Sequence, residues 1–211
     1  MTKKEKVRIV IDRLAQAYPQ SDCTLEYEEP WKLLVSVRLA AQCTDERVNR
    51  IVPGLYDRFP TVAALADADV TEIEAIVSPC GLGKSKARDI KACMQMLRDV
   101  YQEKVPDEMD ELLKLPGVGR KSANLILGDV YHKPAIVTDT HCIRLSNRLG
   151  LVKNETNPAK VEAALWKIVP PKEGNALCHR FVDHGREICT ARTKPYCERC
   201  CLADICPSRQ N

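Results

Sequence analysis

The chain has 211 residues, of which 45% are hydrophobic and 29% are charged, and it contains 9 Gly and 13 Pro. This composition excludes collagen-like and disordered chains, and the length allows one large domain or two small ones with a buried core. The net charge of +3 hides an uneven distribution, because residues 1–110 carry −3 and residues 111–211 carry +6. The second half of the chain is therefore the basic half.

The N-terminal segment shows no export signal. Its first six residues are rich in charge, and Arg8 breaks the apolar run from Val7 to Ile11, so the roughly 7–15 consecutive apolar residues of a signal peptide are missing. The most apolar window, residues 33–41, contains Arg38 and is about half as long as the ~18–20 residues that span a bilayer. We therefore expect a cytoplasmic protein with no membrane partner and with reduced thiols.

Apolar residues recur at helical spacing along most of the chain, for example over residues 7–18 and 87–101, whereas strand-like alternation is scarce. Thr71 with Glu74 has the spacing of a capping box. Asn157 before Pro158 is typical of an N-cap followed by proline in the first turn of a helix. We predict an all-α protein with about nine or ten helices.

A local basic stretch lies within the 87–101 region and just before it. Between residues 84 and 99 only Asp89 and Asp99 oppose five basic residues, which are Lys84, Lys86, Arg88, Lys91 and Arg98. We interpret this stretch as the solvated face of a helix.

A glycine-containing turn lies between two predicted helices, residues 107–113 and 121–130. It reads Leu115, Pro116, Gly117, Val118, Gly119, Arg120 and Lys121. The glycines favour either a plain connection or a concavity of backbone N–H groups that binds a phosphate at the N-terminus of the second helix. The spacing is not that of a Walker loop, so we expect no nucleotide cofactor.

Four separated segments together carry a resemblance to a known family. The string LPGVGRKSAN at residues 115–124 resembles the helix-hairpin-helix of the DNA glycosylase superfamily. The segments AAQCTD at 40–45, GLGKSKA at 81–87 and VTDTH at 137–141 are similar, in the same order, to elements of its endonuclease III branch. The resemblance covers nearly the whole chain.

The resemblance implies roles for individual residues. Lys121 would be the nucleophile and Asp139 the second catalytic group, while Gln42 and Leu82 would fill the gap left by a flipped nucleotide. The DNA backbone would be held by Leu115, Pro116, Gly117, Val118, Gly119 and Arg120. An attacking amine must be neutral, so we expect burial near the positive helix terminus to depress the pKa of Lys121 below the ordinary ~10.4.

Each of these residues also has a simpler interpretation. Lys121 could bind a phosphate as a solvated cation, and Asp139 could cap a helix that begins near Thr140. Leu82 could be an apolar contact at a helix terminus, and Gln42 could be a buried polar bridge.

The chain has eleven cysteines, an odd number that precludes complete internal pairing, and five of them lie within residues 189–206. Four thiolates on one short loop suit zinc or an iron–sulfur cluster, but a zinc ribbon needs two C-x₂-C knuckles and only one is present. The family resemblance implies a [4Fe-4S] cluster on the pattern C-x₆-C-x₂-C-x₅-C. Here the first gap is seven residues, and the implied ligands are Cys189, Cys197, Cys200 and Cys206.

Cys201 directly follows the third implied ligand, so the sequence leaves open which of the two neighbours binds the cluster. Basic residues on the same loop, Arg192, Lys194 and Arg199, would face phosphate. We interpret the six dispersed cysteines as packing residues: Cys23, Cys43, Cys80, Cys93, Cys142 and Cys178.

The resemblance also implies an architecture of two domains. We expect a six-helix barrel domain at residues 20–133 that carries the helix-hairpin-helix at about 107–130. Residues 1–19 and 134–211 would form a discontinuous helical domain with the cluster loop at 189–206.

The implied function is base excision repair in the bacterial cytosol or nucleoid. We expect a monomeric bifunctional DNA glycosylase and apurinic/apyrimidinic (AP) lyase that acts on oxidised or ring-saturated pyrimidines and abasic sites in double-stranded DNA. Three alternatives remain: a monofunctional adenine or thymine mismatch glycosylase of the same fold, a non-catalytic iron–sulfur DNA-binding module, and a zinc-binding interaction protein. Lys121 and the chain length argue against the first.

Overall fold

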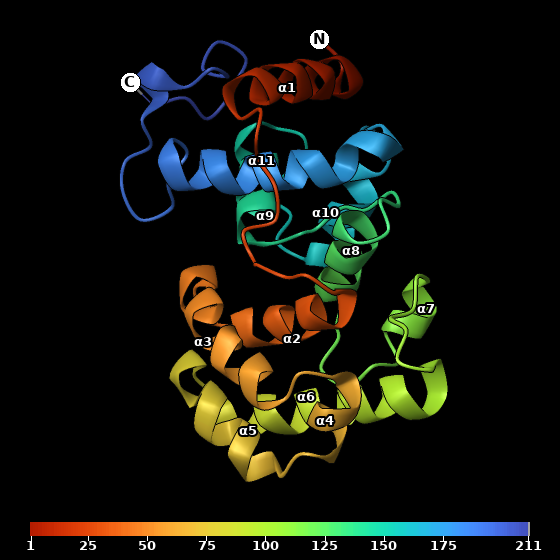
Figure 1. The fold of residues 1–211 in the computed structure, drawn as a ribbon. Helices are drawn as coiled ribbons and strands as arrows, with labels where there is room; N and C mark the ends of the chain where they lie inside the picture. Colours follow the sequence, from red (N-terminus) through yellow and green to blue (C-terminus); the bar gives the residue numbers. More distant parts are fainter. Residues whose placement is uncertain (211) are drawn as a thin grey trace. The chain divides into compact units, whose positions relative to one another are not determined.

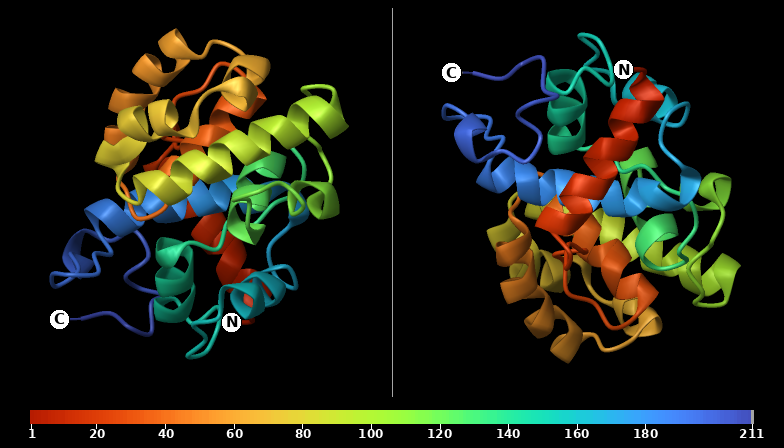
Figure 2. Two further views of the ribbon diagram at one scale, coloured as in Figure 1. Left: turned by 90° about the horizontal axis from the view of Figure 1, so that it is seen from below. Right: turned by 90° about the horizontal axis from the view of Figure 1, so that it is seen from above.

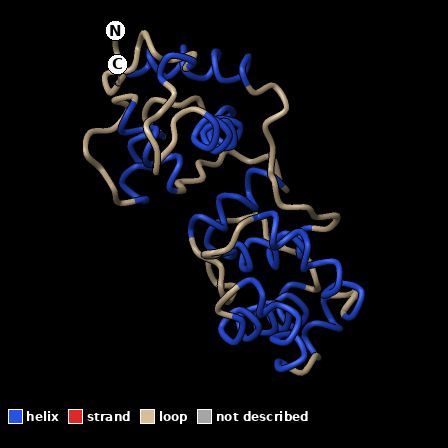
Figure 3. Tube along the Cα trace, turned by 90° about the vertical axis from the view of Figure 1, so that its left-hand side faces the viewer, coloured by secondary structure: helices blue, strands red, loops and turns tan. Residues whose placement is uncertain are grey.

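The computed structural model describes residues 1–210, and the regular secondary structure in this range is entirely helical (Figure 1, Figure 3). It comprises eleven α-helices and three short 3-10 helices, which confirms the predicted all-α class. Contacts between residues divide the chain into an internal unit, residues 23–131, and a terminal unit made of residues 1–22 and 132 onward. Within residues 1–210, no helix combines the length and the apolar character needed to span a membrane.

The internal unit is built around the long helix α6, which packs against α2, α4 and α5 (Figure 2). Ala87, Ile90, Met94 and Leu97 form the buried stripe of α6, in agreement with the predicted periodicity. The helices of this unit are α2 (Pro30–Ala40), α3 (Asp45–Arg58), α4 (Val62–Asp67), α5 (Val70–Val77), η1 (Ser78–Cys80), α6 (Gly83–Tyr101), α7 (Met109–Leu112) and α8 (Arg120–Asp129).

Helix α5 begins one residue before the predicted capping box. Its N-cap is Asp69, whose Oδ1 accepts hydrogen bonds from both the backbone N–H and the hydroxyl of Thr71 at 2.7 Å. The Thr71 hydroxyl is therefore a donor to Asp69 and not the acceptor that a capping box requires. The predicted Thr71–Glu74 capping box is wrong because a stronger cap lies two residues upstream.

The terminal unit combines both ends of the chain. Helix α1 crosses α11 (Figure 2) and buries Val7, Val10, Ile11 and Leu14. Close contact between α9 and α11 depends on Gly185, where an added Cβ would collide with the His141 ring. The helices are α1 (Lys3–Ala17), α9 (Thr140–Arg148), α10 (Pro158–Leu165), η2 (Pro171–Glu173), α11 (Gly174–Glu187) and η3 (Cys197–Arg199).

Two polar contacts attach α1 to distant parts of this unit. The Arg13 guanidinium forms an ion pair with Asp204 and donates to the Cys201 carbonyl at 2.9 Å, and Lys6 Nζ donates to the Leu149 carbonyl at 3.0 Å. Helix α10 begins as predicted, because Asn157 Oδ1 accepts the Lys160 N–H at 3.2 Å.

Candidate functional site

The predicted hairpin is present in the internal unit between α7 and α8. Its turn is closed by the Val118 N–H, which donates to the Leu115 carbonyl at 3.1 Å. Leu115 is buried and anchors the turn, whereas Gly117 and Gly119 are exposed. Both flanking helices are present, although α7 covers only residues 109–112 of the predicted 107–113.

Gly117 is required for two independent reasons. Its φ of +76° lies in the left-handed region, and a Cβ there would stand 2.9 Å from Arg38 Cδ and 3.0 Å from Asp89 Cβ. Arg38 and Asp89 form a part-buried ion pair, with an Nη2–Oδ2 distance of 2.6 Å, and Arg38 Nη2 also lies 3.4 Å from Ser85 Oγ. The hairpin therefore packs at Gly117 against the Arg38–Asp89 ion pair, which joins α2 to α6.

Helix α8 begins directly after the hairpin with no side-chain cap, since its N-cap is Gly119. The first-turn N–H groups of a helix have no intrahelical acceptor, and together with the helix dipole they favour an anion. Lys121 is the second residue of α8 and is exposed. The predicted burial of Lys121 is therefore wrong.

Gln42 and Leu82 occupy two tight turns of the internal unit, the α2–α3 turn and the junction of η1 with α6. Both have left-handed backbone conformations, with φ of 58° and 53°. The Leu82 residue is 57% exposed, which is incompatible with an apolar contact at a helix terminus. Gln42 is exposed as well, so the alternative of a buried polar bridge is wrong.

In the terminal unit, Asp139 follows the buried segment 135–138 and is the N-cap of α9. Its Oδ1 accepts the Cys142 N–H at 2.7 Å. The expected capping interaction is thus present, and it fixes the orientation of the half-buried carboxylate.

The four implied cluster ligands line one cavity of the terminal unit. Cys189, Cys197, Cys200 and Cys206 line it together with His184 of α11 and apolar residues of α9 and of the chain that follows α11. Cys201 is not among the lining residues, and its carbonyl accepts the Arg13 guanidinium instead. The structure thus distinguishes the two neighbouring cysteines.

Polar groups lie close to two of the sulfur atoms of this cavity. Arg148 Nη1 lies 3.2 Å from Cys189 Sγ, the Leu202 N–H lies 3.4 Å from Cys200 Sγ, and His184 Nε2 also lies 3.4 Å from Cys200 Sγ. Such hydrogen bonds stabilise sulfur ligands and orient them. Burial raises the pKa of the Cys200 thiol to about 11 and lowers the pKa of His184 to about 4.

The spacing of the sulfurs bears on which metal they suit. Among residues 1–210, no three of the cysteine sulfurs lie within 4.8 Å of one another. In a tetrahedral zinc site with Zn–S bonds of ~2.3 Å, the sulfurs would be about 3.8 Å apart. In an iron–sulfur cluster each thiolate binds a different iron atom, so sulfurs that do not converge on one point suit a cluster, whereas the four-thiol donor set suits either kind of centre.

Several residues around this cavity were missed by the sequence analysis. Arg144 and Arg148 on α9 donate to the Cys189 carbonyl at 3.2 and 3.3 Å, and Arg148 also donates to the Thr190 carbonyl at 2.8 Å. Burial lowers the pKa of Arg144. Their spacing of four residues places both on one face of α9, and this is the signal that could have found them.

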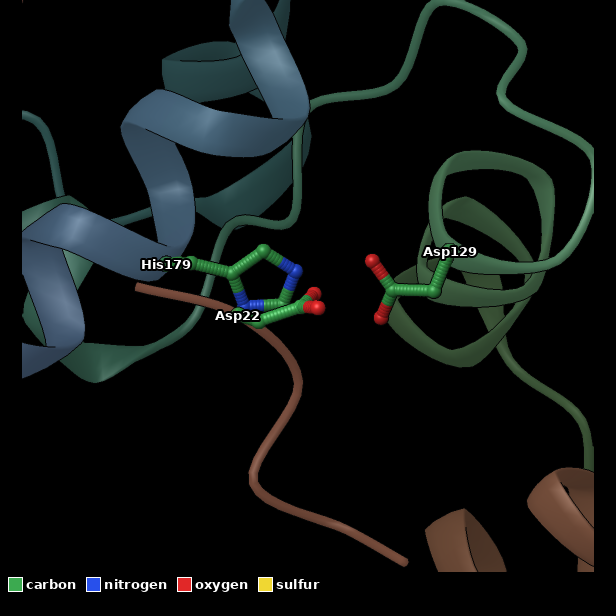
Figure 4. A group of neighbouring side chains, drawn as sticks. All are labelled: Asp22, Asp129 and His179. Carbon is green, nitrogen blue, oxygen red and sulfur yellow. The ribbon is translucent and has the colours of Figure 1, made fainter. Parts of the chain in front are cut away.

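One further group of side chains has ligand chemistry, namely Asp22, Asp129 and His179 (Figure 4). Asp129 is the last residue of α8 and belongs to the internal unit. His179, on α11, and Asp22 belong to the terminal unit. Because the group is drawn from both units, we assign no site to it.

Comparison with known proteins defines the class of protein to which these features belong. Residues 35–171 match the family model described as HhH-GPD superfamily base excision DNA repair protein. The chain is 42% identical to the endonuclease III of Synechocystis sp. over 99% of this chain and 95% of that protein. It is 35% identical to that of Escherichia coli K12 over 100% and 98%. The chain belongs to the endonuclease III family of this superfamily.

Solved structures agree with this assignment. A non-covalent endonuclease III–DNA complex matches with a TM-score of 0.92 and 38% identity, covering 99% of this chain and 97% of that one. A thermostable thymine-DNA glycosylase matches with a TM-score of 0.86 at 21% identity, covering 97% and 96%, and shares the fold. The predicted helix-hairpin-helix glycosylase fold is confirmed.

Proposed function

We propose that this protein is a base excision repair DNA glycosylase and AP lyase that removes oxidised or ring-saturated pyrimidines from double-stranded DNA. The enzyme class follows from membership of the endonuclease III family. The observation that carries the proposal is the position of Lys121, an exposed amine in the first turn of α8 directly after the glycine hairpin.

Lys121 performs the covalent chemistry. Its neutral Nζ attacks C1′ of the damaged nucleotide, the bond from C1′ to the base breaks, and the base leaves with a proton. Opening of the sugar gives an iminium ion at C1′, which acidifies the C2′ hydrogens. Loss of a C2′ proton and departure of the 3′ phosphate then break the strand by β-elimination, and water releases the amine. The Asp139 carboxylate stabilises developing positive charge on the sugar and moves a proton.

The other site residues prepare the substrate. The hairpin from Leu115 to Arg120 and the uncapped amides of α8 bind backbone phosphate without reading sequence. Leu82 enters the base stack as an apolar wedge and Gln42 fills the space of the extruded base, because a base inside a duplex is out of reach.

The cysteine loop is proposed to hold a [4Fe-4S] cluster through Cys189, Cys197, Cys200 and Cys206. When bound, the cluster cross-links the loop and so has a structural role. The exposed basic residues of the loop, Arg192, Lys194 and Arg199, are then fixed for contact with DNA phosphate.

Borohydride trapping tests the nucleophile. On a duplex that contains an abasic site, the wild-type protein is expected to form a covalent adduct, and Lys121→Ala none. Lys114→Ala is a matched control, because Lys114 is an exposed lysine at the other end of the same hairpin. Persistence of the adduct in Lys121→Ala would overturn the assignment. Single-turnover rates on thymine glycol, 5-hydroxycytosine, uracil and abasic duplexes then define the substrate class.

The same experiments separate the alternatives. A monofunctional mismatch glycosylase would excise a base without an adduct and without strand cleavage. A non-catalytic module would bind DNA and leave it unchanged. A preparation of a zinc-binding interaction protein would be colourless. The proposed cluster would instead give visible absorbance at about 400 nm and an iron content of about four atoms per chain.

A further inference from the structure

Lys86 is a lysine in the core of the internal unit. Its accessible surface is 0%, although lysine is almost never fully buried unless its charge is paired. Its Nζ donates to the carbonyls of Leu39 and Cys80, both at 2.8 Å. The interpretation of residues 84–99 as a solvated face is therefore wrong for this residue. No step of the proposed reaction uses it.

The two acceptor carbonyl groups lie at the C-terminal ends of two different helices. Leu39 lies in the last turn of α2, and Cys80 is the last residue of η1. Carbonyls at a helix C-terminus lack intrahelical donors and carry the negative end of the helix dipole, so a cation is the natural partner. One ammonium group thus joins two chain segments that are about 40 residues apart in sequence.

These two segments lead directly into the turns that carry Gln42 and Leu82. Gln42 follows Leu39 by three residues, and Leu82 follows Cys80 by two. The backbone of Lys86 is also attached to the second turn, because its N–H donates to the Leu82 carbonyl at 3.0 Å. Lys86 is therefore bonded to both turns at once.

Both turns need an external restraint. Left-handed backbone conformations at non-glycine residues are unfavourable, and they persist only where the surroundings enforce them. Gln42 and Leu82 are both in this region and both are exposed, so their own side chains supply no burial that would hold them. The hydrogen bonds of Lys86 lie at the base of each turn and provide such a restraint.

We propose that Lys86 is a positioning residue that fixes the two turns at one mutual spacing, so that Gln42 and Leu82 enter the duplex as a unit. The inference rests on the proposed function of these two residues. Lys86 touches neither the substrate nor the reacting atoms, and it acts on extrusion of the base through the two turns. Its effect is therefore confined to substrates in which a base must leave the stack.

Two substrates separate this role from general stabilisation. Excision of thymine glycol from a duplex requires extrusion, whereas β-elimination at an abasic site in single-stranded DNA does not. Lys86→Met removes both hydrogen bonds, and we expect a loss on the order of 10–100-fold in the single-turnover rate on the duplex, as for a small misplacement of a positioning group. The single-strand rate is expected to stay within about threefold of wild type.

Lys91→Met is the matched control, since Lys91 is a half-buried lysine on the same helix, five residues beyond Lys86. Both rates should stay near wild type. If Lys86→Met does not fold, Lys86→Gln carries the same comparison, because its amide keeps two N–H donors on a shorter side chain. An equal loss on both substrates would overturn the positioning role. Failure of the wild-type protein on both substrates would instead overturn the proposed function.

A double-mutant cycle tests the route of the effect. If Lys86 acts through the turns, Lys86→Met should cost little further duplex activity in a Gln42→Ala, Leu82→Ala background, so the losses are strongly non-additive. Additive losses would show that Lys86 acts elsewhere and would refute the inference.

Discussion

Asp139 combines two roles that two substitutions can separate. It caps α9 through the Cys142 N–H, and it supplies the carboxylate of the proposed reaction. Asp139→Asn keeps an oxygen that can accept the same hydrogen bond but removes the negative charge. Asp139→Ala removes both, so the two variants should agree in activity and differ in stability.

The magnitudes follow from the geometry of the cap. Asn caps a helix about as well as Asp, whereas replacing either by Ala costs about 0.5–2 kcal/mol. In a protein of 150–250 residues, 1 kcal/mol changes Tm by roughly 2–4 °C. At the typical cost of about 1 kcal/mol, Asp139→Ala should therefore lower Tm by roughly 2–4 °C. In Asp139→Asn the loss of the negative charge at the helix N-terminus lowers the free energy of unfolding by about 0.3–1 kcal/mol at low ionic strength. Salt screens this contribution.

The assay combines thermal unfolding at moderate salt with single-turnover excision on a thymine glycol duplex. Asp139→Asn should unfold within about 1–2 °C of wild type and Asp139→Ala clearly lower, while both lose most of the excision rate. Wild-type activity in Asp139→Asn would refute the catalytic role of the carboxylate. Equal Tm values for Asn and Ala would refute the capping argument.

Three further predictions concern the hairpin, the wedge and the cysteine loop. Gly117→Ala places a Cβ 2.9 Å from Arg38 Cδ at a positive φ, with a backbone cost of roughly 1–2 kcal/mol, so DNA affinity measured by fluorescence anisotropy should fall. Leu82→Gly should leave Tm unchanged or slightly raised, because glycine accepts φ of 53° without strain, while duplex excision falls; unchanged excision would contradict the wedge role. Cys200→Ser should lose iron and visible absorbance, whereas Cys201→Ser should keep both, and the reverse result would exchange the proposed ligands.

Local features of the chain could be predicted because their causes are local. The caps at Asn157 and Asp139 depend on a side-chain oxygen two or three residues before an N–H group, and both are present. The Thr71 capping box failed for the same kind of reason, since Asp69 lies close by and accepts the Thr71 donors. Where two caps compete, the sequence pattern shows both candidates and not their relative strength.

The interior environment of a side chain depends on distant segments and was predicted less well. Lys86 was assigned to a solvated face because charge counting ignores the face of the helix, yet it shares the buried stripe with Ile90 and Met94. Its partners come from α2 and η1, which no local pattern reveals. Cys200 and Cys201 are chemically identical neighbours, so only the direction of each side chain in three dimensions distinguishes them.

The division of the terminal unit between the two ends of the chain has a consequence during synthesis. The internal unit is contiguous and can fold as soon as residue 131 has emerged from the ribosome. Helix α1 is made before the internal unit, but the α11 surface that covers its apolar face follows about 160 residues later, which at 5–20 residues per second is roughly 8–30 s. The cysteine loop emerges later still. Folding of the terminal unit and loading of the proposed cluster are therefore late events, and the apolar face of α1 is without its α11 partner in the interval.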